Sequence, residues 1–114
     1  MRKDALILIK YFCYGLLGLL LIFKLYTHQY FLSLILAIIY LIILLKRKIT
    51  LPTIVMILGS IFGSVGEIIE THFHVWSYSV ATPLGIPAWL PFAWGLAVHV
   101  IFQISQIFVQ SLKA

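Results

Sequence analysis

Four long apolar runs follow one another in this sequence with only short polar interruptions, and they constrain the fold more than any other feature. The runs cover residues 5–26, 29–46, 50–71 and 88–112. A helix needs about 20 mostly apolar residues to cross the roughly 30 Å hydrocarbon layer of a bilayer. Runs this long and this close together cannot all hide in one water-soluble core. The sequence therefore predicts an all-α integral membrane protein, a bundle of four transmembrane helices forming a single membrane domain over residues 1–114.

The composition agrees with this class. Only 10% of the residues are charged and 63% are hydrophobic, whereas soluble domains average about 25% charged residues. The formal net charge of +5 would suggest nucleic-acid binding in a soluble protein. Here the cations lie at the ends of apolar runs, so we expect membrane lipids as partners and no nucleic acid. The single Cys13 excludes an intramolecular disulfide, and its apolar surroundings predict a packed, inert thiol.

The distribution of cations predicts the orientation. Lys and Arg stay preferentially on the cytoplasmic side of membrane proteins. Six cations lie on one side of the predicted bundle, at Arg2, Lys3, 46–48 and Lys113, and Lys24 lies alone on the other. We therefore expect a bacterial-type cytoplasmic (inner) membrane protein with both termini in the cytoplasm. Lys10 lies inside the first run, so its amine must reach an interface or face other helices.

The connection between the third and fourth runs is unlike a solvated loop. No Asp, Glu, Lys or Arg occurs from Thr71 to Leu112. Its prolines and glycine exclude a continuous helix, and its Trp and Tyr residues are the types that settle at headgroup depth. Two arrangements remain open for this aromatic, Pro/Gly-rich connection. It lies flat on the outer interface, or it is a partly re-entrant cap over polar residues below it.

Small residues mark one face of the third helix. Gly59, Gly63, Gly66 and Glu70 follow one another at spacings of four, three and four residues. The pair Gly59 and Gly63 is a small-xxx-small motif, which lets another backbone approach closely. The motif predicts close packing on this face, either within the chain or in a homo-oligomer.

Acidic and imidazole side chains gather at the end of the third helix. Glu67, Glu70, His72 and His74 lie within eight residues, and carboxylates in hydrocarbon are costly unless they face protein or water. These residue types suit a metal, for which Glu70, His72 and His74 are the candidates. The Glu-x-x-His spacing of di-iron bundles is absent, however, so we predict no metal and no cofactor.

A second polar stripe runs along the fourth helix. It consists of His99, Gln103, Gln106 and Gln110, again at spacings of four, three and four. Since His99 is expected near the depth of Glu67, we predict that the two are neighbours and act as a catalytic acid/base pair. A buried hydrogen-bonded pair with a structural role is the alternative. A substrate in this region would be bound by Glu70, His74, Trp76, Tyr78, Trp94 and Gln103.

A resemblance to a known family covers residues 67–94. The chain reads E-x-x-E-x-x-x-H-x-W-x-Y and then L-G-I-P-A-W-L-P-F-A-W. This resembles the signature region of bacterial carotenoid-biosynthesis membrane proteins of the lycopene-hydratase type. The resemblance implies a membrane-embedded activity on an isoprenoid, and the residues that match the family's motif are Glu67, Glu70, Tyr78, Gly85, Pro87 and Trp94.

Three classes of function remain open at this point. The first is a small multi-pass membrane protein with a polar site near the outer leaflet between the third and fourth helices. The second is a membrane-embedded enzyme that acts on a lipid or isoprenoid by acid/base chemistry. The third is a structural or assembly subunit that packs against other membrane helices or against copies of itself.

Overall fold

The computed structural model describes residues 2–113, and its regular structure is entirely helical. The four helices are α1 (Arg2–Leu25), α2 (Gln29–Arg47), α3 (Leu51–His72) and α4 (Leu90–Lys113). Each is long and apolar enough to cross a membrane. The predicted all-α class with four long apolar helices is confirmed, and the bounds agree with the apolar runs to within three residues.

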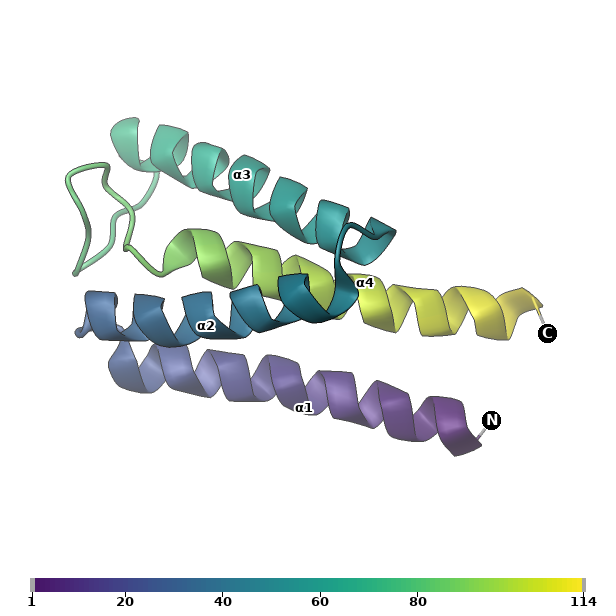
Figure 1. Cartoon of the computed structure of the whole chain (residues 1–114). Helices are drawn as coiled ribbons and strands as arrows, with labels where there is room; N and C mark the ends of the chain where they lie inside the picture. The colour runs from purple at the N-terminus through teal and green to yellow at the C-terminus, as the bar shows by residue number, and fades with distance from the viewer. Residues whose placement is uncertain (1, 114) are drawn as a thin grey trace.

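The helices form an elongated antiparallel bundle that measures 48 × 26 × 25 Å. The N-terminal end of α1, the turn between α2 and α3 and the C-terminal end of α4 lie at one end of it (Figure 1). The turn between α1 and α2 and the connection 73–89 lie at the other end. Helix α4 contacts the three other helices, whereas α1 and α3 do not contact each other within residues 2–113.

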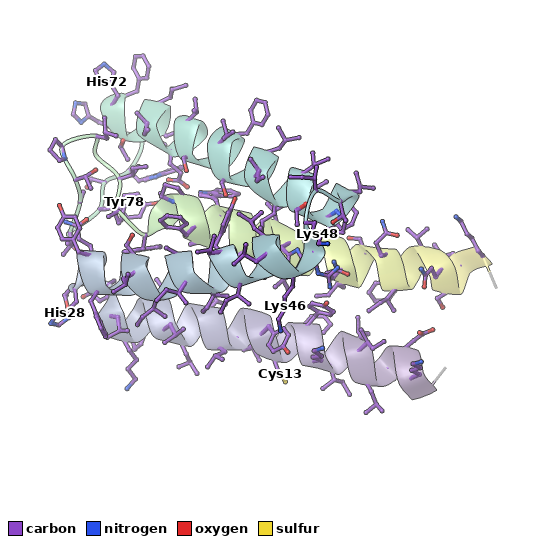
Figure 2. All side chains as sticks on the ribbon, viewed as in Figure 1. Cys13, His28, Lys46, Lys48, His72 and Tyr78 are labelled. Carbon is purple, nitrogen blue, oxygen red and sulfur yellow. The ribbon has the colours of Figure 1, made fainter. Side chains whose placement is uncertain are left out.

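Charge is distributed unequally between the two ends. Lys46 and Lys48 lie around the turn between α2 and α3, on the side toward the chain termini, and His28, His72 and Tyr78 lie at the opposite end (Figure 2). The six cations that predicted the orientation are all positioned at or near the first of these ends, and Lys24 lies in the last turn of α1 at the other. The bundle therefore separates the cations as the sequence predicted.

A threonine motif makes the turn between α2 and α3 tight. The Thr53 hydroxyl donates to the Lys48 carbonyl over 2.6 Å, and the backbone N–H of Thr50 donates to the Thr53 hydroxyl oxygen over 2.9 Å. Pro52 occupies the first turn of α3, where a missing N–H costs no helical hydrogen bond. Thr53 is fully buried. This turn sets α3 antiparallel to α2.

Gly59 and Gly63 on the glycine face of α3 are covered by α4 of the same chain, whereas Gly66 is open, since an added methyl there meets no atom within 4 Å. A methyl group added at Gly59 would lie 2.7 Å from the Val98 side chain, and one added at Gly63 would overlap the Trp94 ring. Gly95 of α4 is equally close to α3, because an added methyl there would overlap the Ser60 hydroxyl. The predicted close approach of a second backbone therefore occurs within the chain.

A left-handed residue ends α3 and reverses the chain. His74 has φ 59°, and its N–H donates to the Thr71 carbonyl while the N–H of Val75 donates to the Glu70 carbonyl over 2.9 Å. This is the Schellman arrangement, in which glycine usually occupies the left-handed position. The reversal turns the following residues back toward α3. Gly85, with φ 89°, makes a second tight turn further along the connection.

The second half of the connection is buried in the end of the bundle. Ile86, Trp89 and Leu90 form a core cluster with Leu32 and Leu36 of α2. The N–H of Ala88 donates to the Gln29 side-chain oxygen over 3.1 Å. Pro91 does not interrupt α4, because it falls in the first turn of that helix. The connection is a folded cap, and it closes the end of the bundle opposite the chain termini.

Cys13 differs from the expectation of a packed thiol. It is exposed and points away from the bundle on the outer side of α1 (Figure 2). The buried residue of this turn is Tyr11. Two helical positions correspond to about 200° of rotation, so burial of Tyr11 places Cys13 on the outer face.

Candidate functional site

The most specific polar arrangement in the structure is centred on Glu67. Its Oε2 atom accepts two hydrogen bonds, one from Trp76 Nε1 and one from the Tyr78 hydroxyl, each 2.8 Å long. Glu67 belongs to α3, and both donors belong to the connection that returns after the turn at His74. Hydrogen bonds to an ionised carboxylate are stronger than those between neutral groups. The two donors therefore fix the orientation of the Glu67 carboxylate.

Tyr78 lies between the end of α3 and the start of α4 (Figure 2) and packs against the core cluster of the cap. Burial raises the pKa of the Tyr78 phenol well above its ordinary value, and the hydrogen bond to Glu67 and the charge of that carboxylate raise it further. Each of these effects disfavours the phenolate. Tyr78 therefore keeps its proton and remains a donor to Glu67 at all physiological pH values.

We expect Tyr78 to ionise well above the usual tyrosine pKa of about 10. The protonated phenol stabilises the folded protein, and this contribution should be complete below about pH 10. It should disappear as the pH rises through the elevated pKa of Tyr78, because the phenol of the unfolded chain loses its proton at lower pH than that of the folded chain. Phenolate absorbance of the detergent-solubilised protein against pH measures this. Tyr78→Phe should remove the rise in phenolate absorbance that occurs at the elevated pKa of Tyr78, which we call the late step. Tyr26→Phe, in the turn between α1 and α2, should leave this late step unchanged. Persistence of the late step in Tyr78→Phe would contradict the assignment.

The other residues predicted at this end lie around the turn that ends α3. Glu70 is half-buried, whereas His72 and His74 are exposed. Both imidazoles border a hollow of about 600 Å³ between the end of α3 and the turn at 83–85. Within the described part of the chain, no three His, Cys, Asp or Glu side chains converge to hold a metal ion. Glu70, His72 and His74 are thus not assembled as a metal site.

The predicted contact between Glu67 and His99 is wrong, and the packing of α3 on α4 gives the reason. Gly59 lies against Val98 and Gly63 lies against Trp94. The two helices are therefore antiparallel, and a position four residues later in α3 contacts a position four residues earlier in α4. His99 therefore lies near the level of Gly59. Glu67 is eight residues beyond Gly59, which is about 12 Å at about 1.5 Å per residue. No direct acid/base pair forms across this distance.

The remaining candidates on α4 lie at different levels of the bundle, Trp94 about one turn from the level of Glu67 and Gln103 further away. Trp94 packs over Gly63, and Gln103 lies one turn beyond His99, further from the cap. His99 is only 4% exposed, and its Nδ1 and the Nε2 of Gln103 are buried without a hydrogen-bond partner among residues 2–113. The structure thus brings Glu67, Trp76 and Tyr78 together and leaves His99 and Gln103 in a different part of the bundle.

Sequence reasoning included Trp76 and Tyr78 among the substrate-binding residues but missed that both donate to Glu67. The missing information was the reversal of the chain after α3. A glycine at position 74 would have signalled a left-handed helix end, but the residue there is His74. Trp76 and Tyr78 follow Glu67 by nine and eleven residues, and neither spacing corresponds to neighbours on one helix face or one strand face. The sequence pattern therefore does not indicate that they are in contact.

Comparison with known proteins identifies no relative of this chain. No family model, no curated protein and no solved structure matches the chain. The resemblance of residues 67–94 to the carotenoid-biosynthesis proteins therefore stays a prediction, and the functional argument rests on the geometry around Glu67.

Proposed function

We propose that the protein is a multi-pass protein of a bacterial-type inner membrane with both termini in the cytoplasm, and that Glu67 acts there by proton transfer on the polar end of a lipid or isoprenoid. The observation that carries the proposal is the pair of hydrogen bonds onto Glu67 Oε2 from Trp76 and Tyr78. Together with the connection 73–89, these residues form a polar site near the outer leaflet.

The arrangement supports this chemistry because the two donors occupy one carboxylate oxygen. The other oxygen, Oε1, can accept a hydrogen bond from a substrate hydroxyl, and as a general base it can take the hydroxyl proton while the hydroxyl oxygen forms its bond to an electrophilic second substrate. Tyr78 supplies a neutral donor that stabilises the carboxylate before the transfer. A fixed orientation of the base lowers the cost of reaching the reactive geometry.

The surroundings of the site favour an amphiphilic substrate. Phe73 is 71% exposed and Leu84 is 65% exposed, and both line the hollow at the end of α3, so large apolar side chains are exposed at the same end of the bundle as the polar group. A ligand with one hydroxyl and a long apolar chain would match both features. The resemblance of residues 67–94 to proteins of carotenoid biosynthesis favours an isoprenoid as that chain.

Retention of isoprenoid and lipid alcohols by the purified protein tests the proposal. We expect farnesol or oleyl alcohol to bind, and Glu67→Gln to weaken binding by about tenfold, because a hydrogen bond to a charged group contributes about 1.5–3 kcal/mol. Asp4→Asn, in the first turn of α1 at the opposite end of the bundle, is the control and should bind like the unmodified protein. Equal losses in the two variants, or no binding of either alcohol, would contradict the proposed site.

An assembly subunit is less favoured by the structure of α3. Its small-residue face, which would be the natural surface for another membrane helix, is already in contact with Val98 and Trp94 of the same chain. A partner helix would have to use a different face.

The proposed orientation makes a labelling prediction. In a Cys13→Ser background, Ser79→Cys in the connection should react with a membrane-impermeant maleimide on intact cells, because it lies at the end opposite the cationic turn. Lys48→Cys should react only after the cells are permeabilised, since cations favour the cytoplasmic side. The two positions are both exposed, so accessibility within the fold does not separate them. Labelling of Lys48→Cys on intact cells would contradict the orientation.

A further inference from the structure

Lys10 is the cation that the topology of the bundle leaves unexplained. Its Nζ atom lies 5.9 Å from the ring centre of Tyr11 and 5.7 Å from that of Tyr14. Arg47 Nη2 of α2 donates to the hydroxyl of the same Tyr11 over 3.0 Å. Two cations from different helices therefore contact the same tyrosine, Tyr11.

This part of the bundle has a strong excess of positive charge. Of the three acidic residues in the chain, only Asp4 lies on the same side as Lys10 and Arg47, because Glu67 and Glu70 belong to the opposite end. Lys46, Lys48 and Lys113 add to the positive charge. The Lys10 and Arg47 side chains are both donors suited to a phosphate group, with which they would form charge-assisted hydrogen bonds.

An apolar groove begins at the same tyrosines. It lies between α1 and α4, has a volume of about 370 Å³ and runs from Tyr11 and Tyr14 to Ile22 and Ala93. Glycines on α1 keep it open, since a methyl group added at Gly18 would meet no atom within 4 Å.

The length of the groove matches one leaflet of a bilayer. Tyr11 and Ile22 are eleven residues apart on α1, which corresponds to about 16 Å at about 1.5 Å per residue. Half of the roughly 30 Å hydrocarbon layer is about 15 Å. An acyl chain that starts at the level of Lys10 would therefore fill the groove to its far end.

We propose that this groove binds an anionic phospholipid, with the phosphate held by Lys10 and Arg47 and one acyl chain lying along Gly15 and Gly18. The site is separate from Glu67 and rests only on the membrane insertion proposed above. The excess of cations favours a lipid with net negative charge over a zwitterionic lipid with the same chains.

Lipid titration of the purified full-length protein, followed by native mass spectrometry, tests the headgroup site. We expect phosphatidylglycerol to bind about tenfold more tightly than phosphatidylcholine of the same chain length. Lys10→Gln should abolish this preference. Lys24→Gln, on the same helix at the opposite end, is the matched control and should keep it. Equal binding of the two lipids, or equal effects of the two variants, would overturn the proposal.

Two further measurements distinguish the contribution of the lipid acyl chain to binding from that of the headgroup. Gly18→Leu should fill the groove and weaken both lipids by about tenfold, whereas Leu20→Phe, outside the groove, should change neither. Inorganic phosphate should not displace phosphatidylglycerol, and displacement would show a free-anion site instead. Binding that survives in Gly18→Leu, or a mass that shows a second copy of the chain in place of lipid, would overturn the proposal.

Different results would contradict the proposed lipid site and the membrane insertion on which it depends. Protein that stays in carbonate-washed membranes but binds the two lipids equally would overturn the lipid site alone. Release of the protein by carbonate would overturn membrane insertion, and the lipid site with it.

Discussion

Gly63→Leu is expected to lower the free energy of unfolding by about 3 kcal/mol, the upper part of the range for overpacking. The reason is the contact between α3 and α4. Even a methyl group at this position would overlap the Trp94 ring, and a leucine side chain is larger still. Either α4 must move away from α3 or Trp94 must leave its position. Thermal unfolding in detergent, followed by circular dichroism, measures the effect.

Gly66→Leu is the matched control for this variant. It makes the same chemical change on the same helix, so the gain in helix propensity from replacing glycine is the same in both. An added methyl at Gly66 meets no atom within 4 Å, so we expect little loss of stability. Ile38→Leu on an exposed position of α2 should also be nearly silent. Equal shifts in Gly63→Leu and Gly66→Leu would show that α4 does not cover this face.

The helices were predictable from the sequence because the residues at and between their ends determine where each helix begins and ends. Apolar runs of this length favour helices in a membrane, and Thr50 followed by Pro52 marks the start of α3. The one boundary that differs by three residues is the start of α1 at Arg2. Charged residues are compatible with a first helical turn, so the apolar run alone underestimated this helix.

The candidate site was only partly predictable, because its partners depend on how the helices are aligned. The sequence identified Glu67 as a carboxylate that needs protein or water around it. The predicted contact between Glu67 and His99 requires that α3 ends and α4 begins at the same level of the bundle. In the structure the residues before Leu90 are buried in the bundle end, and the packing of Gly63 on Trp94 places Leu90 at the level of Glu67. His99 is nine residues further along α4.

The partner of Glu67 is testable by a double-mutant cycle. Glu67→Ala and Tyr78→Phe should each destabilise the protein, and the double variant should lose about 1–2 kcal/mol less than the sum of the two, because both single variants remove the same hydrogen bond. The 2.8 Å distance between the Tyr78 hydroxyl and Glu67 Oε2 is the basis for this coupling. Unfolding in detergent near neutral pH, where Tyr78 is protonated, measures all four proteins.

A second cycle, Glu67→Ala with His99→Ala, uses the same carboxylate variant and provides the comparison. Residues more than about 7–10 Å apart with no shared partner are additive to within about 0.3–0.5 kcal/mol. The alignment of Gly59 with Val98 and of Gly63 with Trp94 separates Glu67 from His99 by about 12 Å along the helices, so this cycle should show no coupling beyond that limit. If His99 were coupled to Glu67 more strongly than Tyr78 is, the alignment of α3 with α4 would be incorrect. Glu67 would then belong to a site in the interior of the bundle, and the cap formed by residues 73–89 would not be its partner.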